Sequence, residues 1–347
     1  MYIHTFKVGC ALKGEDFYLI QQELRKKGPN KWVALKEGMR YWGLSDKGII
    51  IIMKRTKKKD FFSYSIIYKI SALRVIENDN FVGLFDTQNY EELEDKVNSI
   101  LNKACKLLPC LEKCTLSRID FCVNTEFDDH KQVEAYIKTV KRGNIPPKLK
   151  LYERNDPKAK RKKASKNEFT VRAGKYVEVS IYNKYAEMKE QMDYNYPDGE
   201  IERAKNIVRI EIRCKEGKVR ELAKKYHISS IERFMERADG IGDELYQYYL
   251  GKMFNRGSVC TLKEALERID MSEYRRDTIK KLKEFLSKCN ECRSAAKAFE
   301  YYKKTDMGYI IKLLNNIETN YVTVTKDVRQ ILGDYIPTPL ELYKAFA

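Results

Sequence analysis

Three segments of the chain carry side chains that could together cut and rejoin a phosphodiester. Asp120 and Glu211 each interrupt an apolar stretch, and Tyr182 and Lys184 lie in a third stretch between them. Two carboxylates that share one sheet face are costly unless a cation lies between them, and oxygen ligands suit Mg²⁺ or Mn²⁺. The phenol of Tyr182 could attack a phosphate and form a covalent phosphotyrosine. The metal would polarise the phosphoryl oxygen, and Lys184 would offset the developing charge.

An ordinary structural role is the alternative for these residues. An Arg-x-Glu pattern on a strand, as at Arg209 and Glu211, often forms a surface ion pair that contributes little. Tyr182 is one of 24 tyrosines, so its residue type alone does not mark it as catalytic.

Other catalytic motifs are missing from the sequence. The three histidines are far apart, so the chain has no His-x-His pair and no H-E-x-x-H. It has no Walker A sequence and no G-x-G-x-x-G, which disfavours nucleotide-driven motors and Rossmann oxidoreductases. One C-x-x-C, from Cys289 to Cys292, is a weak zinc signal because a zinc site needs four ligands.

The charge balance points to a polyanionic partner. The chain has 67 Lys and Arg against 50 Asp and Glu, which gives a net charge of +17, and many tyrosines could stack on bases. A basic membrane-surface protein is the competing class, but no strongly amphipathic basic helix stands at either end and no apolar run is long enough to span a bilayer. Nine scattered cysteines and no secretion signal favour a cytoplasmic protein with reduced thiols.

The elements that position these residues change character along the chain. Apolar and polar residues alternate over 115–125, 170–184 and 206–215, which predicts strands, and helical spacing is found over 90–108 and 128–140. From residue 219 the pattern is mainly helical. We therefore expect two regions, a β-rich catalytic domain over 1–218 and a mainly helical DNA-binding or accessory region over 219–347.

Two segments are candidates for DNA contacts. A basic loop over 155–168 is expected to bind phosphates, although a solvated linker is the alternative, and its cations are Lys158, Lys160, Arg161, Lys162 and Lys163. Thr261 and Glu264 predict a capping box that begins a helix over 262–269, and a second helix follows over 274–286. Such a pair could be a helix-turn-helix, but adjacent helices are also common in proteins that do not bind DNA.

The three strand segments also resemble a known family. R-I-D-F-C-V-N at residues 118–124, S-I-Y-N-K-Y-A-E at 180–187 and R-I-E-I at 209–212 are similar to motifs of rolling-circle replication initiators of the trans-acting plasmid type. They also resemble the replication endonucleases of filamentous phages. The similarity covers about residues 110–215, where the motifs occur in the family's order.

The resemblance implies a role for each matched residue. Tyr182 would be the nicking nucleophile that stays on the 5′ end and leaves a 3′ hydroxyl for a polymerase. Asp120 and Glu211 would be metal ligands, with Glu187 as a further candidate. Tyr185 would be an alternate nucleophile or a packing residue, sharing a helix face with Tyr182 if that stretch is helical.

Two positions depart from the family pattern. Asn124 stands where plasmid members often have Asp, and Ser180 stands where they have Arg. These changes remove a strand carboxylate and a phosphate contact. We assign Arg118 and Arg209 to DNA binding.

The expected fold is α+β, with an antiparallel sheet and flanking helices followed by a mainly helical C-terminal region. The expected function is nicking at a plasmid or phage origin to start rolling-circle replication, followed by rejoining of the strand. The expected partners are origin DNA and the host helicase and polymerase, with a homodimer left open and no membrane. A non-enzymatic DNA-binding regulator and a conjugative relaxase are the alternatives, and an RNA-binding protein is a third class.

Overall fold

The computed structural model describes residues 1–346 except 79, 147, 153–165 and 191–195. The described chain divides into two compact units, which we treat separately. Unit 1 comprises Met1–Cys122 and Arg213–Gly242, and unit 2 comprises Val123–Ile212 and Asp243–Ala347. The expected division at residues 218 and 219 into a nicking domain and an accessory region stays a prediction.

Three elements run through both units. Two of these are strands that carry the motif residues, and the third is a long helix. Their bounds are β7 (Thr115–Glu126), β11 (Ile207–Lys215) and α9 (Ala238–Met253).

Unit 1 is built on an antiparallel sheet. Its strands are ordered β2-β3-β4-β5-β1-β7, followed by β11, with β6 paired to β1. Its strands are β1 (Tyr2–Leu12), β2 (Trp32–Leu35), β3 (Gly38–Tyr41), β4 (Ile49–Lys57), β5 (Phe62–Ser71) and β6 (Phe85–Asp86). Its helices are α1 (Gly14–Lys27), α2 (Ala72–Ile76), η1 (Thr87–Asn89), α3 (Tyr90–Ala104), η2 (Leu111–Lys113), α7 (Glu216–Lys225) and α8 (Ile231–Glu236).

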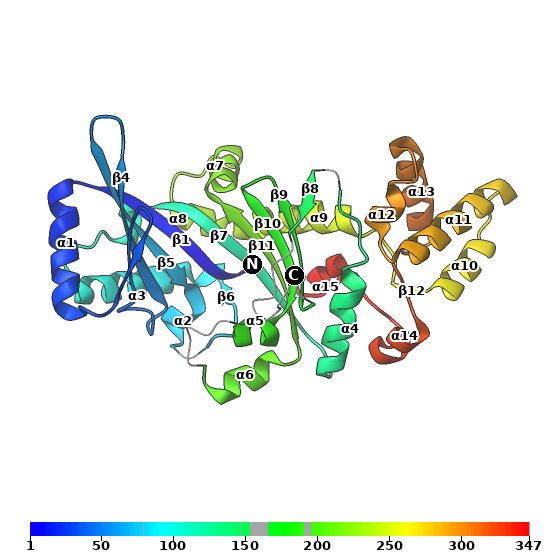
Figure 1. The fold of residues 1–347 in the computed structure, drawn as a ribbon, viewed down its shortest axis with the longest axis horizontal. Coiled ribbons are helices and arrows are strands. Elements are labelled where there is room, and N and C mark those ends of the chain that lie inside the picture. The colour runs from blue at the N-terminus through cyan, green and yellow to red at the C-terminus, as the bar shows by residue number, and fades with distance from the viewer. Residues whose placement is uncertain (79, 147, 153–165, 191–195, 347) are drawn as a thin grey trace. The chain divides into compact units, whose positions relative to one another are not determined.

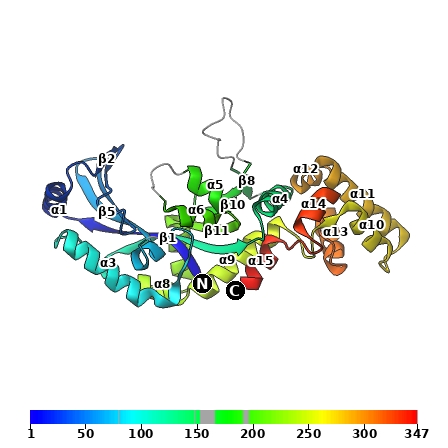
Figure 2. The same ribbon diagram turned by 90° about the horizontal axis from the view of Figure 1, so that it is seen from below.

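One face of the unit 1 sheet carries the apolar core. Phe6 and Val8 on β1 and Ile66, Tyr68 and Ile70 on β5 are buried, and the residues between them are less buried. Helix α1 contacts β5 and helix α2 contacts β1, and α3 runs along one face of this sheet (Figure 2). The alternation along the strands therefore separates an apolar helix-covered face from a polar face.

Unit 2 continues from β7 and β11 to β10, β9 and β8. Its helices α10 to α13 lie together in Figure 1, and β12 and β13 form a separate parallel pair. Its strands are β8 (Leu149–Leu151), β9 (Glu168–Ala173), β10 (Val177–Asn183), β12 (Cys260–Thr261) and β13 (Thr323–Val324). Its helices are α4 (His130–Val140), α5 (Lys184–Glu190), α6 (Asp198–Ala204), α10 (Leu262–Asp270), α11 (Arg276–Cys292), α12 (Ala295–Phe299), α13 (Lys304–Asn316), α14 (Lys326–Leu332) and α15 (Pro339–Phe346).

Most element predictions are confirmed, including the α+β class and the helical C-terminal region. The Thr261–Glu264 capping box is present at the start of α10, and α11 is the second helix of the expected pair. The expected single strand over 170–184 was wrong. Gly174 has φ +58°, so the chain turns there and β9 and β10 form an antiparallel hairpin. No described helix is both long and apolar enough to cross a bilayer.

Candidate functional site

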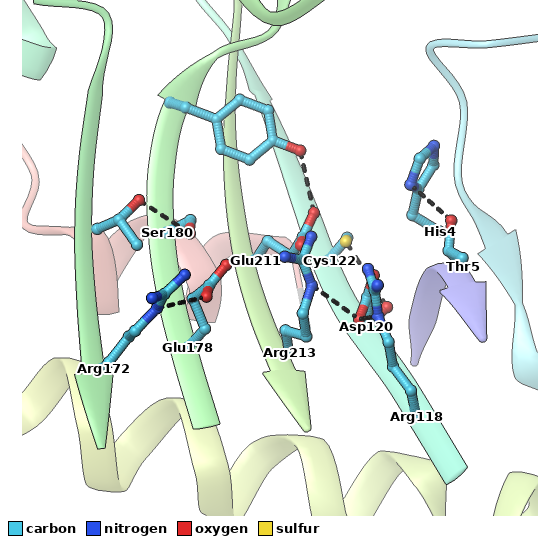
Figure 3. A network of polar contacts seen from close by, with 12 residues as sticks. His4, Thr5, Arg118, Asp120, Cys122, Arg172, Glu178, Ser180, Glu211 and Arg213 are labelled. Carbon is cyan, nitrogen blue, oxygen red and sulfur yellow. Dashed lines mark hydrogen bonds and ion pairs between the residues drawn. The ribbon is translucent and has the colours of Figure 1, made fainter. Parts of the chain in front are cut away.

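The candidate nucleophile lies at the end of a fully buried strand in unit 2. Tyr182 is the penultimate residue of β10, and its hydroxyl donates a hydrogen bond of 3.0 Å to Oε2 of Glu211 on β11. The Tyr182 side chain is 8% exposed and Glu211 is 4% exposed. Figure 3 shows Glu211 at this contact. A phenol held against a buried carboxylate has a proton acceptor in place.

A buried lysine follows directly. Lys184 begins α5, and its Nζ lies 2.8 Å from Oε2 of Glu187, one turn along the helix. Asn183 fixes the turn between strand and helix, because its side-chain oxygen accepts a hydrogen bond from the backbone N–H of Ala186. Burial lowers the pKa of Lys184, and the carboxylate of Glu187 offsets this only in part.

The two candidate tyrosines do not share a helix face. Helix α5 begins at Lys184, so Tyr182 is on the strand and only Tyr185 is on the helix. The Tyr185 ring is half-buried and packs edge-on against His130 at 5.3 Å between centroids. The Nζ of Lys189 lies 4.3 Å from the Tyr185 ring centroid. The choice between an alternate nucleophile and a packing residue at Tyr185 stays a prediction.

Arg209 occupies the interior of unit 2. It is 0% exposed, and its Nε donates a 2.7 Å hydrogen bond to the side-chain oxygen of Asn124 on β7. A guanidinium at zero exposure could contact a phosphate only if the site opens, as Tyr182 would also require, so the DNA-binding role of Arg209 stays a prediction. Asn124 thus has a partner at the position where the plasmid-type motif often has Asp.

Asp120 in unit 1 is held between two arginines. Its Oδ1 accepts from Nε of Arg118 at 2.8 Å and from Nε of Arg213 at 3.3 Å, and its Oδ2 contacts Nη2 of Arg118. Figure 3 shows both guanidiniums directed at this carboxylate. Burial opposes the charged form of Asp120, which is 1% exposed, but the two arginines outweigh it and hold the pKa of Asp120 below its ordinary value.

The expected metal ligands were Asp120 and Glu211, with Glu187 as a further candidate. Over residues 1–346 apart from the gaps given above, no group of three or more His, Cys, Asp and Glu side chains could hold a metal ion. A cation between the carboxylates was the expectation, and the described partners of Asp120 are two guanidiniums instead.

Of the remaining expected DNA contacts, one lies in the described part of the chain and five lie outside it. Arg118 is described, with 19% of its side chain exposed. The expected phosphate-binding loop residues lie outside the described residues, and these are Lys158, Lys160, Arg161, Lys162 and Lys163.

Sequence reasoning missed the neighbours of Arg118. Lys7 on β1 is the direct cross-strand partner of both Lys69 on β5 and Arg118 on β7. Only the strand register brings these three residues together, because they are 111 positions apart from first to last (118 − 7). The one available signal was that Lys7 and Lys69 are each a cation between apolar strand residues.

The chain was compared with known proteins. No curated protein matches it. Among solved structures it is similar to a rolling circle replication initiator protein from Geobacillus stearothermophilus, with 13% identity over 64% of this chain and 76% of that chain and a TM-score of 0.29. Residues 21–233 match the family model that describes the N-terminal part of a phage replication-associated protein. These residues make up more than half of the 347 and include Asp120, Tyr182 and Glu211, so the chain belongs to this family of phage replication-associated proteins.

Proposed function

We propose that this protein nicks one DNA strand at a replication origin through a covalent 5′-phosphotyrosine on Tyr182, which starts rolling-circle replication, and later rejoins the strand. The observation that supports it most directly is the hydrogen bond from the Tyr182 hydroxyl to the buried carboxylate of Glu211. Both residues lie in the part of the chain that matches the replication-associated family.

The proposed reaction exchanges one phosphodiester for another. Glu211 takes the phenolic proton as the Tyr182 oxygen attacks the phosphorus. The bond from phosphorus to the 3′ oxygen breaks, and that oxygen takes a proton from solvent and leaves as a 3′ hydroxyl. Lys184 offsets charge on the phosphoryl oxygens. Rejoining runs the same steps in reverse, so no bond energy is lost.

Access to the nucleophile requires a change in the site. Tyr182 is 8% exposed, and its hydroxyl is already engaged by Glu211. The scissile phosphate therefore reaches the hydroxyl only when the surroundings of β10 open. Such a closed state would protect the nucleophile until DNA is bound.

The hydrogen bonds and ion pairs of the candidate ligands bear on whether they could hold the proposed cofactor, Mg²⁺ or Mn²⁺. Asp120 does not fit a metal ligand as described, because both of its oxygens contact guanidiniums. Glu211 and Glu187 supply oxygen donors of the right chemistry, but each is engaged, by Tyr182 and by Lys184 respectively. The described residues thus do not fit a ready-made metal site. The metal requirement stays a prediction.

The first experiment uses supercoiled DNA that carries the origin region next to this gene. The protein is incubated with it in Mg²⁺, in Mn²⁺ and in EDTA, and relaxation and a denaturant-resistant protein–DNA adduct are measured. We expect an adduct that Tyr182→Phe abolishes while binding persists. Tyr176→Phe, at an exposed tyrosine outside the site, is the matched control.

Each alternative has its own outcome in this assay. An adduct lost in Tyr185→Phe but kept in Tyr182→Phe would move the nucleophile by three residues. Tight binding with no adduct in any metal would leave the DNA-binding regulator. An adduct formed only at a transfer origin would indicate a conjugative relaxase with the same chemistry.

A further inference from the structure

A row of four cations crosses the polar face of the unit 1 sheet, and we call it the basic row. It is formed by Lys69, Lys7, Arg118 and Arg213, one from each of the neighbouring strands β5, β1, β7 and β11. The strand register pairs Lys69 directly with Lys7, and Lys7 directly with Arg118. Like charges that face each other across strands destabilise a sheet.

The arginines and the lysines of the basic row differ in their partners. Asp120 pairs with Arg118 and Arg213. In the described part of the chain, neither Lys7 nor Lys69 has a hydrogen bond or an ion pair from its Nζ. Both lysines are half-buried, so water compensates their charge only in part.

Burial and the neighbouring cations both disfavour the charged forms of the two lysines. Burial, followed by the charges of Arg118 and Lys69, lowers the pKa of Lys7 to about 8, while Asp120 acts in the opposite direction. Burial also lowers the pKa of Lys69, with Arg118 as the largest charge contribution. A lysine ordinarily titrates near 10.4, so the folded protein alone disfavours these charges.

The row lies on the face of the sheet away from the apolar core. Lys7 alternates with the buried Phe6 and Val8, and Lys69 alternates with the buried Tyr68 and Ile70. The core side chains and helices α1 and α2 therefore pack on the opposite face. An arrangement that costs stability and faces away from the core is typical of a binding site for an anion.

We propose that the basic row binds consecutive phosphates of a DNA strand. This rests on the proposed function, which makes DNA the substrate. Adjacent strands are about 4.8 Å apart, so Lys69 to Arg118 spans roughly 10 Å, which is the axial rise of about three phosphates along one strand of a duplex. Contacts from Lys and Arg to phosphates fix the position of DNA and carry no sequence information. The basic row therefore positions DNA without reading its sequence.

The two arginines and the two lysines of the basic row have different roles. Asp120 fixes the guanidiniums of Arg118 and Arg213 in direction, so they are oriented before DNA arrives. Lys7 and Lys69 carry the excess charge. Bound phosphates would compensate it and remove the repulsion along the row.

The test compares stability with DNA binding in the full-length protein. Lys7→Gln and Lys69→Gln are made singly and together, with Lys26→Gln, at an exposed lysine of α1, as the matched control. Fluorescence anisotropy of a fluorescein-labelled 24-base-pair duplex of mixed sequence gives the affinity from 50 to 300 mM NaCl. We expect each row variant to bind more weakly and to lower the slope of log affinity against log salt by about 0.9, because one phosphate contact is lost.

The same variants should be more resistant to urea without DNA, since each removes repulsion along the row. Weaker binding together with higher stability separates a binding role from a structural one. Unchanged salt slopes, or slopes that change equally in Lys26→Gln, would overturn the proposal. Row variants that are less stable than the wild type would also overturn it.

Failure of this proposal is distinguishable from failure of the proposed function. If the row variants bind DNA normally and still form the Tyr182 adduct, the row is wrong and the nicking proposal stands. If the wild type forms no adduct but the row variants lose salt-dependent binding, the row is right and nicking is wrong.

Discussion

Asp120 offers a sharp test of whether this carboxylate is structural or a metal ligand. Asp120→Asn keeps the size of the side chain and removes its charge. The side chain is 1% exposed and contacts the guanidiniums of Arg118 and Arg213. Removing one partner of a buried ion pair costs about 3–5 kcal/mol, because the other charges stay buried without compensation. Domains are stable by about 5–15 kcal/mol in total, so the loss should be large.

The assay follows from where the tryptophans lie. The chain has two, Trp32 and Trp42, and both belong to unit 1 with Asp120. Tryptophan fluorescence during urea unfolding therefore reports on the unit that holds the carboxylate. With a urea dependence of about 2 kcal/mol/M, we expect Asp120→Asn to lower the midpoint by about 1.5–2.5 M at pH 7.

The matched control is Glu92→Gln, which lies in the same unit as Asp120 and the tryptophans. Glu92 pairs with Lys96, but its side chain is 62% exposed. An exposed ion pair contributes about 0–1 kcal/mol, so the midpoint should change little.

The pH dependence provides a second criterion. The pKa of Asp120 is held below its ordinary value, so its contribution to stability is present above about pH 3.9 and is lost as the pH falls through the lower folded value. The difference between wild type and Asp120→Asn should shrink below that range. A midpoint equal to that of Glu92→Gln at pH 7 would refute the structural assignment, and loss of metal-dependent adducts in so stable a variant would favour the metal-ligand role.

Three further predictions address the candidate site and the basic row. Glu211→Gln should slow adduct formation by about 10²–10⁴-fold, the range for a lost general base, while duplex affinity in anisotropy stays within twofold; a rate near wild type would exclude Glu211 as the proton acceptor. Burial and the charges of Arg118, Lys69 and Arg213 lower the pKa of Lys7 to about 8, while Asp120 acts in the opposite direction. Lys7 therefore loses its proton between pH 7 and 9, so duplex affinity should fall over this range. The fall should be smaller in Lys7→Gln. Asn124→Ala should lower the free energy of unfolding by about 1–3 kcal/mol, because it removes the acceptor of the buried Arg209 Nε; far-UV circular dichroism in urea measures this, and an unchanged midpoint would count against it.

Local pattern predicted much of the fold. The capping box at Thr261, the helix that begins at Tyr90 and the strands around Asp120 and Glu211 follow from short-range spacing, and the structure contains all of them. The hairpin at Gly174 was missed because apolar and polar residues alternate in both of its strands, before and after the turn. A period of two indicates a strand without showing where the chain reverses.

The order of the amino acids was enough to identify the family motifs, the net positive charge and the candidate nucleophile. The partners of these side chains follow from the fold. Tyr182 meets Glu211, Asp120 meets two arginines, and Lys7 meets Lys69 and Arg118 through strand pairing. The physical reason is that a carboxylate between apolar residues needs compensation, and a sequence does not specify whether a metal, a hydroxyl or a guanidinium provides it. That choice depends on sheet register, which joins residues far apart in the chain.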